Sequence, residues 1–175
     1  AGGDITVRGT GGQSLRGGNY GVAFYSGSTL ATTGSGSVRI EGTGGTGGNN
    51  NYGVYFAPSG SGVTVEDGAL EILGTGGLGG NTSRGVALDG AKCFSTSTGL
   101  MSVIGVGGGG AGTSGNSGII VKNTVMSGDS GNITLAGTSG AGMRAITGGP
   151  PRARTSTRCH PPGRARRRRS CPSCR

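Results

Sequence analysis

The sequence predicts an all-β fold: a parallel β-helix of about 4.5 rungs, each of about 32 residues and three short strands. Three observations predict it. The tetrapeptide Gly-Thr-Gly-Gly recurs at residues 9–12, 42–45 and 74–77. A segment of alternating apolar and polar residues precedes it, and a Gly-plus-β-branched segment follows it after a polar loop. A fixed period of this length is typical of a solenoid, whose units bury a face only by stacking on one another.

The first strand of each unit is predicted from strict alternation. Its first and third positions are always apolar, and its second position is mostly polar, which indicates a strand with one buried face. The five segments are ITVR at 5–8, VRIE at 38–41, LEIL at 70–73, MSVI at 101–104 and ITLA at 133–136. In-register stacking would also place Arg39 beside Glu71 as an outward ion pair, a weak contribution at an exposed site.

The second strand opens with glycine and a β-branched residue. Stacked units would align two inward columns, which are Val22/Val54/Val86/Ile119 and Phe24/Phe56/Leu88/Val121. A weaker third strand is expected at residues 31–33, 63–65 and 94–96, and less clearly at 125–126. Three parallel sheets around so thin a core would need few large side chains, which fits an aromatic content of 4%.

Glycine makes up 44 of the 175 residues. We expect these glycines to supply positive φ in the turns and to let neighbouring turns stack without a side chain between them. The asparagines at the loop ends fit the same need, because asparagine tolerates the left-handed region. They are Asn19, Asn51, Asn81 and Asn116.

Two regions are expected. Residues 1–149 form the β-helix domain, in units near 4–36, 37–69, 70–100, 101–132 and 133–149. Residues 150–175 hold nine arginines and no acid, so the whole net charge of +9 lies there, and we expect this segment to be disordered. Three origins stay open for it: an out-of-frame end, a real basic tail, or a zinc or nucleic-acid module. The candidate zinc ligands are Cys159, His160, Cys171 and Cys174.

Two other structures were weighed for the repeat region. A flexible Gly/Ser/Thr-rich linker would not keep its apolar residues in phase over four units. A β-propeller needs four strands and usually about 40 residues in each blade. Because the sequence begins inside the repeat pattern, we also expect it to be part of a longer protein.

No motif in the repeat region predicts catalysis, a cofactor or a metal. Three matches to G-x-G-x-x-G, at 42–47, 74–79 and 105–110, lack the helix that nucleotide binding requires. Glu66, Asp67 and Asp89 are interpreted as solvated turn acids rather than calcium ligands. No inferred face collects the carboxylates that a polysaccharide-cleaving site needs, and the region has no histidine. Cys93 is expected to be a small core residue.

The units follow the form V-x-I-x-G-T-G-G, N-Y-G-V-Y-F and V-T-V-x-x-G-A-L over residues 4 to about 149. This pattern resembles the repeats of filamentous-haemagglutinin-like adhesins and autotransporter-passenger-like β-helix proteins of bacteria. The resemblance implies an extended structural or adhesive shaft without enzymatic activity, exported to the cell surface and associated with the outer membrane. It implies no catalytic residues. Because the sequence has no run of about 18 apolar residues, we expect no membrane span. We also expect no nucleic-acid partner for the repeat region, whose charges balance.

The expected partners are host or neighbouring-cell surface glycans or proteins, together with further rungs of the same parent chain. The polar loops vary in sequence and stack on one edge of the predicted solenoid, so we expect contacts to run along them. These loops are residues 13–19, 46–51, 78–83 and 111–117. The alternatives are a carbohydrate-active β-helix enzyme and, for the basic tail, a zinc- or nucleic-acid-binding module.

Overall fold

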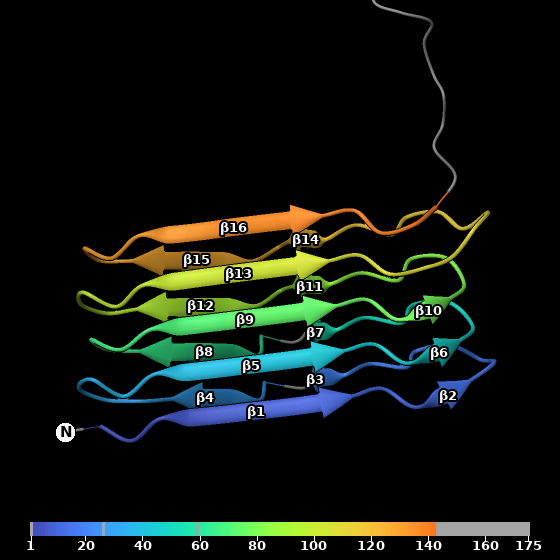
Figure 1. Cartoon of the computed structure of the whole chain (residues 1–175). Coiled ribbons are helices and arrows are strands. Elements are labelled where there is room, and N and C mark those ends of the chain that lie inside the picture. Colours follow the sequence, from blue (N-terminus) through green and yellow to red (C-terminus); the bar gives the residue numbers. More distant parts are fainter. Residues whose placement is uncertain (1, 26, 59, 143–175) are drawn as a thin grey trace, which may run out of the picture. The chain divides into compact units, whose positions relative to one another are not determined.

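A computed structural model describes residues 2–25, 27–58 and 60–142, and these residues coil into a parallel β-solenoid (Figure 1). Every strand pairs in parallel with the equivalent strand one rung away, and four sheets run along the stack of rungs. The predicted all-β parallel β-helix is therefore confirmed. The expectations for residues 150–175, including the zinc ligands, lie outside the described residues.

Sheet A is the longest and matches the predicted register. Its pairing aligns Ile5 with Val38, Leu70, Met101 and Ile133, as the alternating segments predicted. The inward side chains of the middle strands are fully buried, whereas Ile133 and Leu135 in the last strand are 39% and 47% exposed. The strands are β1 (Ile5–Thr10), β5 (Val38–Thr43), β9 (Leu70–Thr75), β13 (Met101–Val106) and β16 (Ile133–Thr138).

Sheet C supplies the opposing wall of the core, and its register aligns both predicted inward columns, with Val121 in the last strand 45% exposed. The rings of Phe24 and Phe56 stack with centroids 4.4 Å apart, and Val54, Val86 and Leu88 are fully buried. Burial of one such side chain contributes about 1.5–3 kcal/mol, so stacked columns stabilise a rung that could not fold alone. The strands are β3 (Val22–Phe24), β7 (Val54–Phe56), β11 (Val86–Asp89) and β14 (Ile119–Lys122).

Sheet D corresponds to the predicted third strand, but the predicted register was wrong by one residue. Leu30, Val63, Cys93 and Met126 form its inward column, whereas Phe94 points outward and is half-buried. The turns between sheets C and D differ in length from rung to rung, so spacing alone could not set the pairing, and a one-residue slip exchanges the two faces. The strands are β4 (Thr29–Ala31), β8 (Gly62–Val65), β12 (Lys92–Ser95) and β15 (Val125–Gly128).

A short fourth sheet lies at the start of the polar loops, where the sequence analysis expected no strand. Sheet B pairs two residues from each of three successive rungs. The first three loops have nearly equal lengths, so their first residues stack in register. Its strands are β2 (Gln13–Ser14), β6 (Thr46–Gly47) and β10 (Leu78–Gly79), at one end of the rungs in Figure 1.

The glycines of the tetrapeptide are needed for close backbone approach rather than for positive φ. A Cβ built on Gly42 would lie 2.0 Å from the carbonyl oxygen of Gly53, where sheet A ends against the start of sheet C. The same contact recurs at Gly9, Gly74 and Gly105 with their partners in sheet C. None of these four glycines has positive φ; the expected positive φ is found instead at turn glycines such as Gly17 and Gly47. The expectation that stacked turns need a missing side chain is confirmed at Gly45, whose Cβ would lie 1.8 Å from the carbonyl oxygen of Gly12 one rung away.

The loop-end asparagines were assigned the wrong role. Among the described residues, the non-glycine positions with positive φ are Asn50, Thr82 and Asn123, and none of them was in the predicted set. The stacked column instead contains Asn19, Asn51, Ser83 and Asn116, all of which are buried. The amide nitrogen of Asn51 lies 2.8–3.2 Å from the carbonyl oxygens of residues 47, 48 and 78, so its side chain ties two rungs together.

Replacing Gly9 by alanine should strongly destabilise the solenoid. The new Cβ would lie 2.0 Å from the carbonyl oxygen of Gly21, so the two backbones must move apart. We expect the free energy of unfolding to fall by about 3 kcal/mol, the upper end for overpacking. Gly12→Ala in the same tetrapeptide is the matched control, because its Cβ would point into open space. Urea titration followed by circular dichroism would contradict this account if both variants lost equal stability.

Removing the Asn51 amide should also destabilise the fold, through hydrogen bonds. Asn51→Ala leaves buried carbonyl oxygens without this donor and deprives the Asn19 amide of an acceptor 2.8 Å away. We expect a loss of about 2–3 kcal/mol in the same urea titration, because unsatisfied buried polar groups are costly. Asn132→Ala, at an exposed asparagine, should change stability by less than about 0.5 kcal/mol. Equal losses would show that the buried amide column does not stabilise the stack.

Candidate functional site

The four tyrosines of the chain lie together on the outer face of sheet C and form the tyrosine patch: Tyr20, Tyr25, Tyr52 and Tyr55. Tyr55 lies at its centre, with ring centroids 4.9 Å from Tyr20, 5.3 Å from Tyr52 and 6.1 Å from Tyr25. The rings of Tyr20 and Tyr52 stack at 5.3 Å. Tyr25 is half exposed, whereas Tyr52 is buried under its neighbours.

The repeat itself assembles this patch. Tyr20 and Tyr52 occupy equivalent positions just before the strands of sheet C, so stacking places one ring over the other. Tyr55 is the outward residue of β7, and its register neighbours Ala23 and Ala87 are small. Alanines on both sides leave room for the Tyr55 ring to reach across the sheet to the other rings.

Sequence analysis used the Tyr-Gly-Val segments only to mark strands and missed the patch. Folding the sequence at its repeat period would have aligned Tyr20 with Tyr52. Tyr25 could not be placed in this way, because it follows the end of β3.

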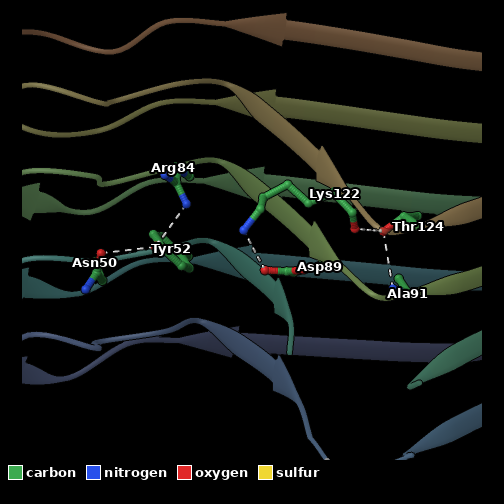
Figure 2. A network of polar contacts seen from close by, with 7 residues as sticks. All are labelled: Asn50, Tyr52, Arg84, Asp89, Ala91, Lys122 and Thr124. Carbon is green, nitrogen blue, oxygen red and sulfur yellow. Dashed lines mark hydrogen bonds and ion pairs between the residues drawn. The ribbon is translucent and has the colours of Figure 1, made fainter. Parts of the chain in front are cut away.

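A chain of polar contacts borders the patch (Figure 2). The guanidinium carbon of Arg84 lies 5.3 Å from the centroid of the Tyr52 ring, and Arg84 Nη1 donates to the Tyr52 hydroxyl at 3.1 Å. The same hydroxyl donates to Asn50 Oδ1 at 3.1 Å. Arg84 therefore continues the Tyr20–Tyr52 column into the third rung and fixes the Tyr52 ring.

One rung further along, Lys122 Nζ donates to Asp89 Oδ2 at 3.1 Å. Asp89 Oδ1 and Arg84 Nε are buried and have no hydrogen-bond partner among the described residues. An unpaired buried acceptor and an unpaired buried donor are uncommon in folded proteins. We call Arg84, Asp89 and Lys122 the charged strip.

Tyr20, Tyr25 and Tyr55 stay neutral over the physiological range. Burial raises the pKa of Tyr20 to about 12, with smaller contributions from the neighbouring tyrosines. Burial also raises the pKa of Tyr25 and of Tyr55. The patch therefore offers uncharged aromatic rings with hydroxyl groups at their edges.

The predicted contact loops do stack on one edge. Backbone hydrogen bonds join each loop to the next, from Gly18 N to Asn49 O at 2.9 Å, from Asn50 N to Asn81 O at 3.0 Å and from Thr82 N to Ser114 O at 2.7 Å. Leu15 and Leu78 are the most exposed large apolar side chains there. Whether these loops contact a partner stays a prediction.

The outer face of sheet A carries a second charged group. The predicted Arg39–Glu71 ion pair is present, Arg39 Nε also donates to Glu41 Oε1 at 2.6 Å, and Arg8 reaches Glu41 at 2.6 Å. The hydrogen bond that Arg39 donates to Glu41, and after it the charge of Glu71, raise the pKa of Arg39. Two carboxylates thus share one face, which sequence analysis did not foresee, but both are held by arginines rather than free to transfer protons.

The threonines of the tetrapeptide form an exposed outward column at Thr10, Thr43, Thr75 and Thr138. Val106 interrupts it, and the neighbouring outward column holds Arg8, Glu41 and Leu73. A single interrupted hydroxyl column between charged and apolar side chains is not a flat, uniform binding surface.

The turn acids serve the backbone. Asp4 Oδ1 accepts the amide hydrogen of Ser37 at 2.8 Å, and Glu66 Oε2 accepts that of Gly34 at 2.7 Å. Within the described ranges, no group of three or more histidine, cysteine, aspartate or glutamate residues could hold a metal ion. The part of the chain that the structure describes also contains no helix long and apolar enough to cross a bilayer.

Comparisons of the chain with protein-family models, with curated proteins and with solved structures find nothing that matches. The fold and the geometry of the patch therefore carry the functional argument.

Cys93 is a core residue, as predicted. It is fully buried in sheet D, and burial raises the pKa of its thiol from 9.0 to about 11. Its thiol should therefore be protected in the folded state, since thiolate is the reactive form. In a chain with Cys159, Cys171 and Cys174 replaced by serine, we expect Ellman's reagent to modify Cys93 only as fast as the solenoid opens. Immediate modification in native buffer would contradict its burial.

The same thiol should make stability depend on alkaline pH. Because its pKa is raised on folding, its contribution is intact below pH 9 and is lost progressively as the pH rises toward about 11. The variant Cys93→Ala should lack this part of the loss in urea titrations between these pH values. An unchanged slope would show that Cys93 does not cause it.

Proposed function

We propose that the repeat region is a non-enzymatic structural or adhesive segment of a secreted, surface-exposed bacterial protein, of the filamentous-haemagglutinin-like or autotransporter-passenger-like kind. The observation that carries the proposal is the stacking of nearly identical rungs whose inward columns repeat while their outward columns change. A solenoid of this kind presents a long, regular surface on which a few side chains can be varied without loss of the core.

Several features of the described residues support an adhesive role over catalysis. Tyr25 in the tyrosine patch and Leu15 and Leu78 in the stacked loops are exposed, and the carboxylates on sheet A are paired with arginines. The described residues hold six basic and seven acidic side chains, so 6 − 7 gives a net charge of −1 for this part. That balance does not favour binding to the phosphates of nucleic acids.

Adhesion can be measured with beads coated with the full chain. They should be retained on layers of bacterial or epithelial cells more strongly than beads coated with heat-unfolded chain. Antibodies to the repeat region should also reveal a protein on intact source cells that external proteinase K removes while a cytoplasmic marker survives. Equal retention of both kinds of bead, or protection from the protease, would contradict the proposal.

A carbohydrate-active β-helix enzyme is the second candidate, because Glu41 and Glu71 share the outer face of sheet A. The full chain can be incubated with polygalacturonate and with xylan, and new reducing ends can be measured. Product formation that Glu41→Gln abolishes would favour the enzyme. An absence of product from both polymers would leave Glu41 as a partner of Arg8 and Arg39 only.

A further inference from the structure

We propose that the tyrosine patch, together with the charged strip beside it, binds a carbohydrate chain that runs along the solenoid axis. This inference rests on the proposed adhesive function and gives it a place, the outer face of sheet C, which differs from the loops that the sequence favoured. It also names the ligand class as a neutral oligosaccharide of pyranose units.

The aromatic part of the surface suits the apolar faces of sugar rings. The faces of tyrosine rings carry negative partial charge, which attracts the C–H groups that line one side of a pyranose. Tyr25 is half exposed, and Tyr20 and Tyr55 are partly exposed, so ring surface is accessible. Tyr52 below them is held by Asn50 and Arg84, so the platform is ordered before a ligand arrives.

The polar part suits hydroxyl groups. A sugar hydroxyl both donates and accepts. The charged strip offers it the ammonium group of Lys122, whose side chain is 59% exposed, and the carboxylate of Asp89, whose side chain is 19% exposed.

The spacing of the rungs matches a linear chain of sugars. Tyrosines lie on the first and second rungs, Arg84 and Asp89 on the third, and Lys122 on the fourth. Successive rungs are about 4.8 Å apart, close to the length of one pyranose unit in an extended chain. An oligosaccharide of four to six units could therefore place its first sugars on the rings and its later hydroxyls on the charged strip.

Other partners fit less well. A stable protein interface buries about 800 Å² on each side, and a patch of four tyrosines over two rungs, about 10 Å high, is small for that. The charged strip holds Arg84 and Lys122 against Asp89, so an anionic ligand would meet a net charge of only +1 together with the Asp89 carboxylate. A small, rigid aromatic surface with the hydrogen-bonding side chains of Asp89 and Lys122 at its border fits a neutral carbohydrate best.

The chain provides its own probe of this surface. It contains no tryptophan, and all four tyrosines belong to the patch, so its tyrosine fluorescence reports on this site alone. The full chain can be titrated with cellohexaose, chitohexaose, mannohexaose and maltohexaose. We expect a saturable change of emission with at least one, with a dissociation constant of about 1 mM or below, a weak interaction in free-energy terms.

Variants separate binding from folding. Tyr55→Ala should weaken binding at least tenfold, and Asp89→Asn severalfold, as measured by calorimetry with the responding sugar. Phe94→Ala is the matched control, because Phe94 is a half-buried outward aromatic residue on sheet D and should leave binding unchanged. If Tyr55→Ala alters the circular dichroism spectrum, Tyr25→Ala at the exposed margin of the patch replaces it, with the same expected loss of binding.

Each outcome decides the inference. The inference is overturned if the fluorescence does not change with any of the four sugars at a concentration 10-fold above the expected dissociation constant. It is also overturned if Phe94→Ala weakens binding as much as Tyr55→Ala does. A third outcome is that Tyr55→Ala abolishes the retention of the beads while an excess of soluble sugar does not reduce the retention of wild-type beads. That result would overturn the inference and assign the patch to a protein partner. If beads coated with the Tyr55→Ala chain are retained as well as wild-type beads, the inference is overturned while the adhesive function stands. If wild-type beads are not retained, the proposed function itself is contradicted.

Discussion

The close approach of two backbones, where sheet A ends against the start of sheet C, is the constraint on which the rest of the solenoid depends. At each of four rungs a glycine of sheet A lies so near a glycine carbonyl before sheet C that no Cβ fits between them. Glycines at both positions bring the two sheets together on that side of the coil. The core is therefore thin, and single columns of valine, isoleucine, leucine and phenylalanine are enough to fill it.

Since the core is thin, hydrogen bonds between rungs contribute much of the order at the edges. The buried amides of Asn19 and Asn51 bind carbonyl groups of their own rung and of the next. Turn acids accept amide hydrogens across the same spacing. These contacts fix the loops to the rung period and so hold the outward side chains at defined heights, which a binding surface along the axis needs.

Sequence alone predicted the parts of the fold that repeat at constant spacing. The register of sheet A followed from the positions of Ile5, Val38 and Leu70, and that of sheet C from Val22, Val54 and Val86. Each of these residues lies at a constant distance in sequence from the repeated glycines of its unit, with no insertion between. The register of sheet D did not follow, since the preceding turns vary in length. The loop-end asparagines were predicted to adopt positive φ, because asparagine tolerates that backbone conformation. In the structure Asn19 and Asn51 are placed instead by their side-chain amides, which donate to buried carbonyl oxygens. The tyrosine patch required outward positions from three different places in the rung to be combined, and strand patterns alone do not supply that.

The patch also shows how a repeated fold can carry a local site. The column Tyr20, Tyr52 and Arg84 keeps its position while its chemistry changes from aromatic to cationic, and the column that begins at Tyr25 continues through Ala57 and Asp89 to Lys122. None of these changes touches the inward residues, so they leave the core columns as they are. Each rung contacts only its neighbours, and the tyrosines occupy two adjacent rungs with the charged strip on the next two. The tyrosine patch and the charged strip therefore both lie within four consecutive described rungs.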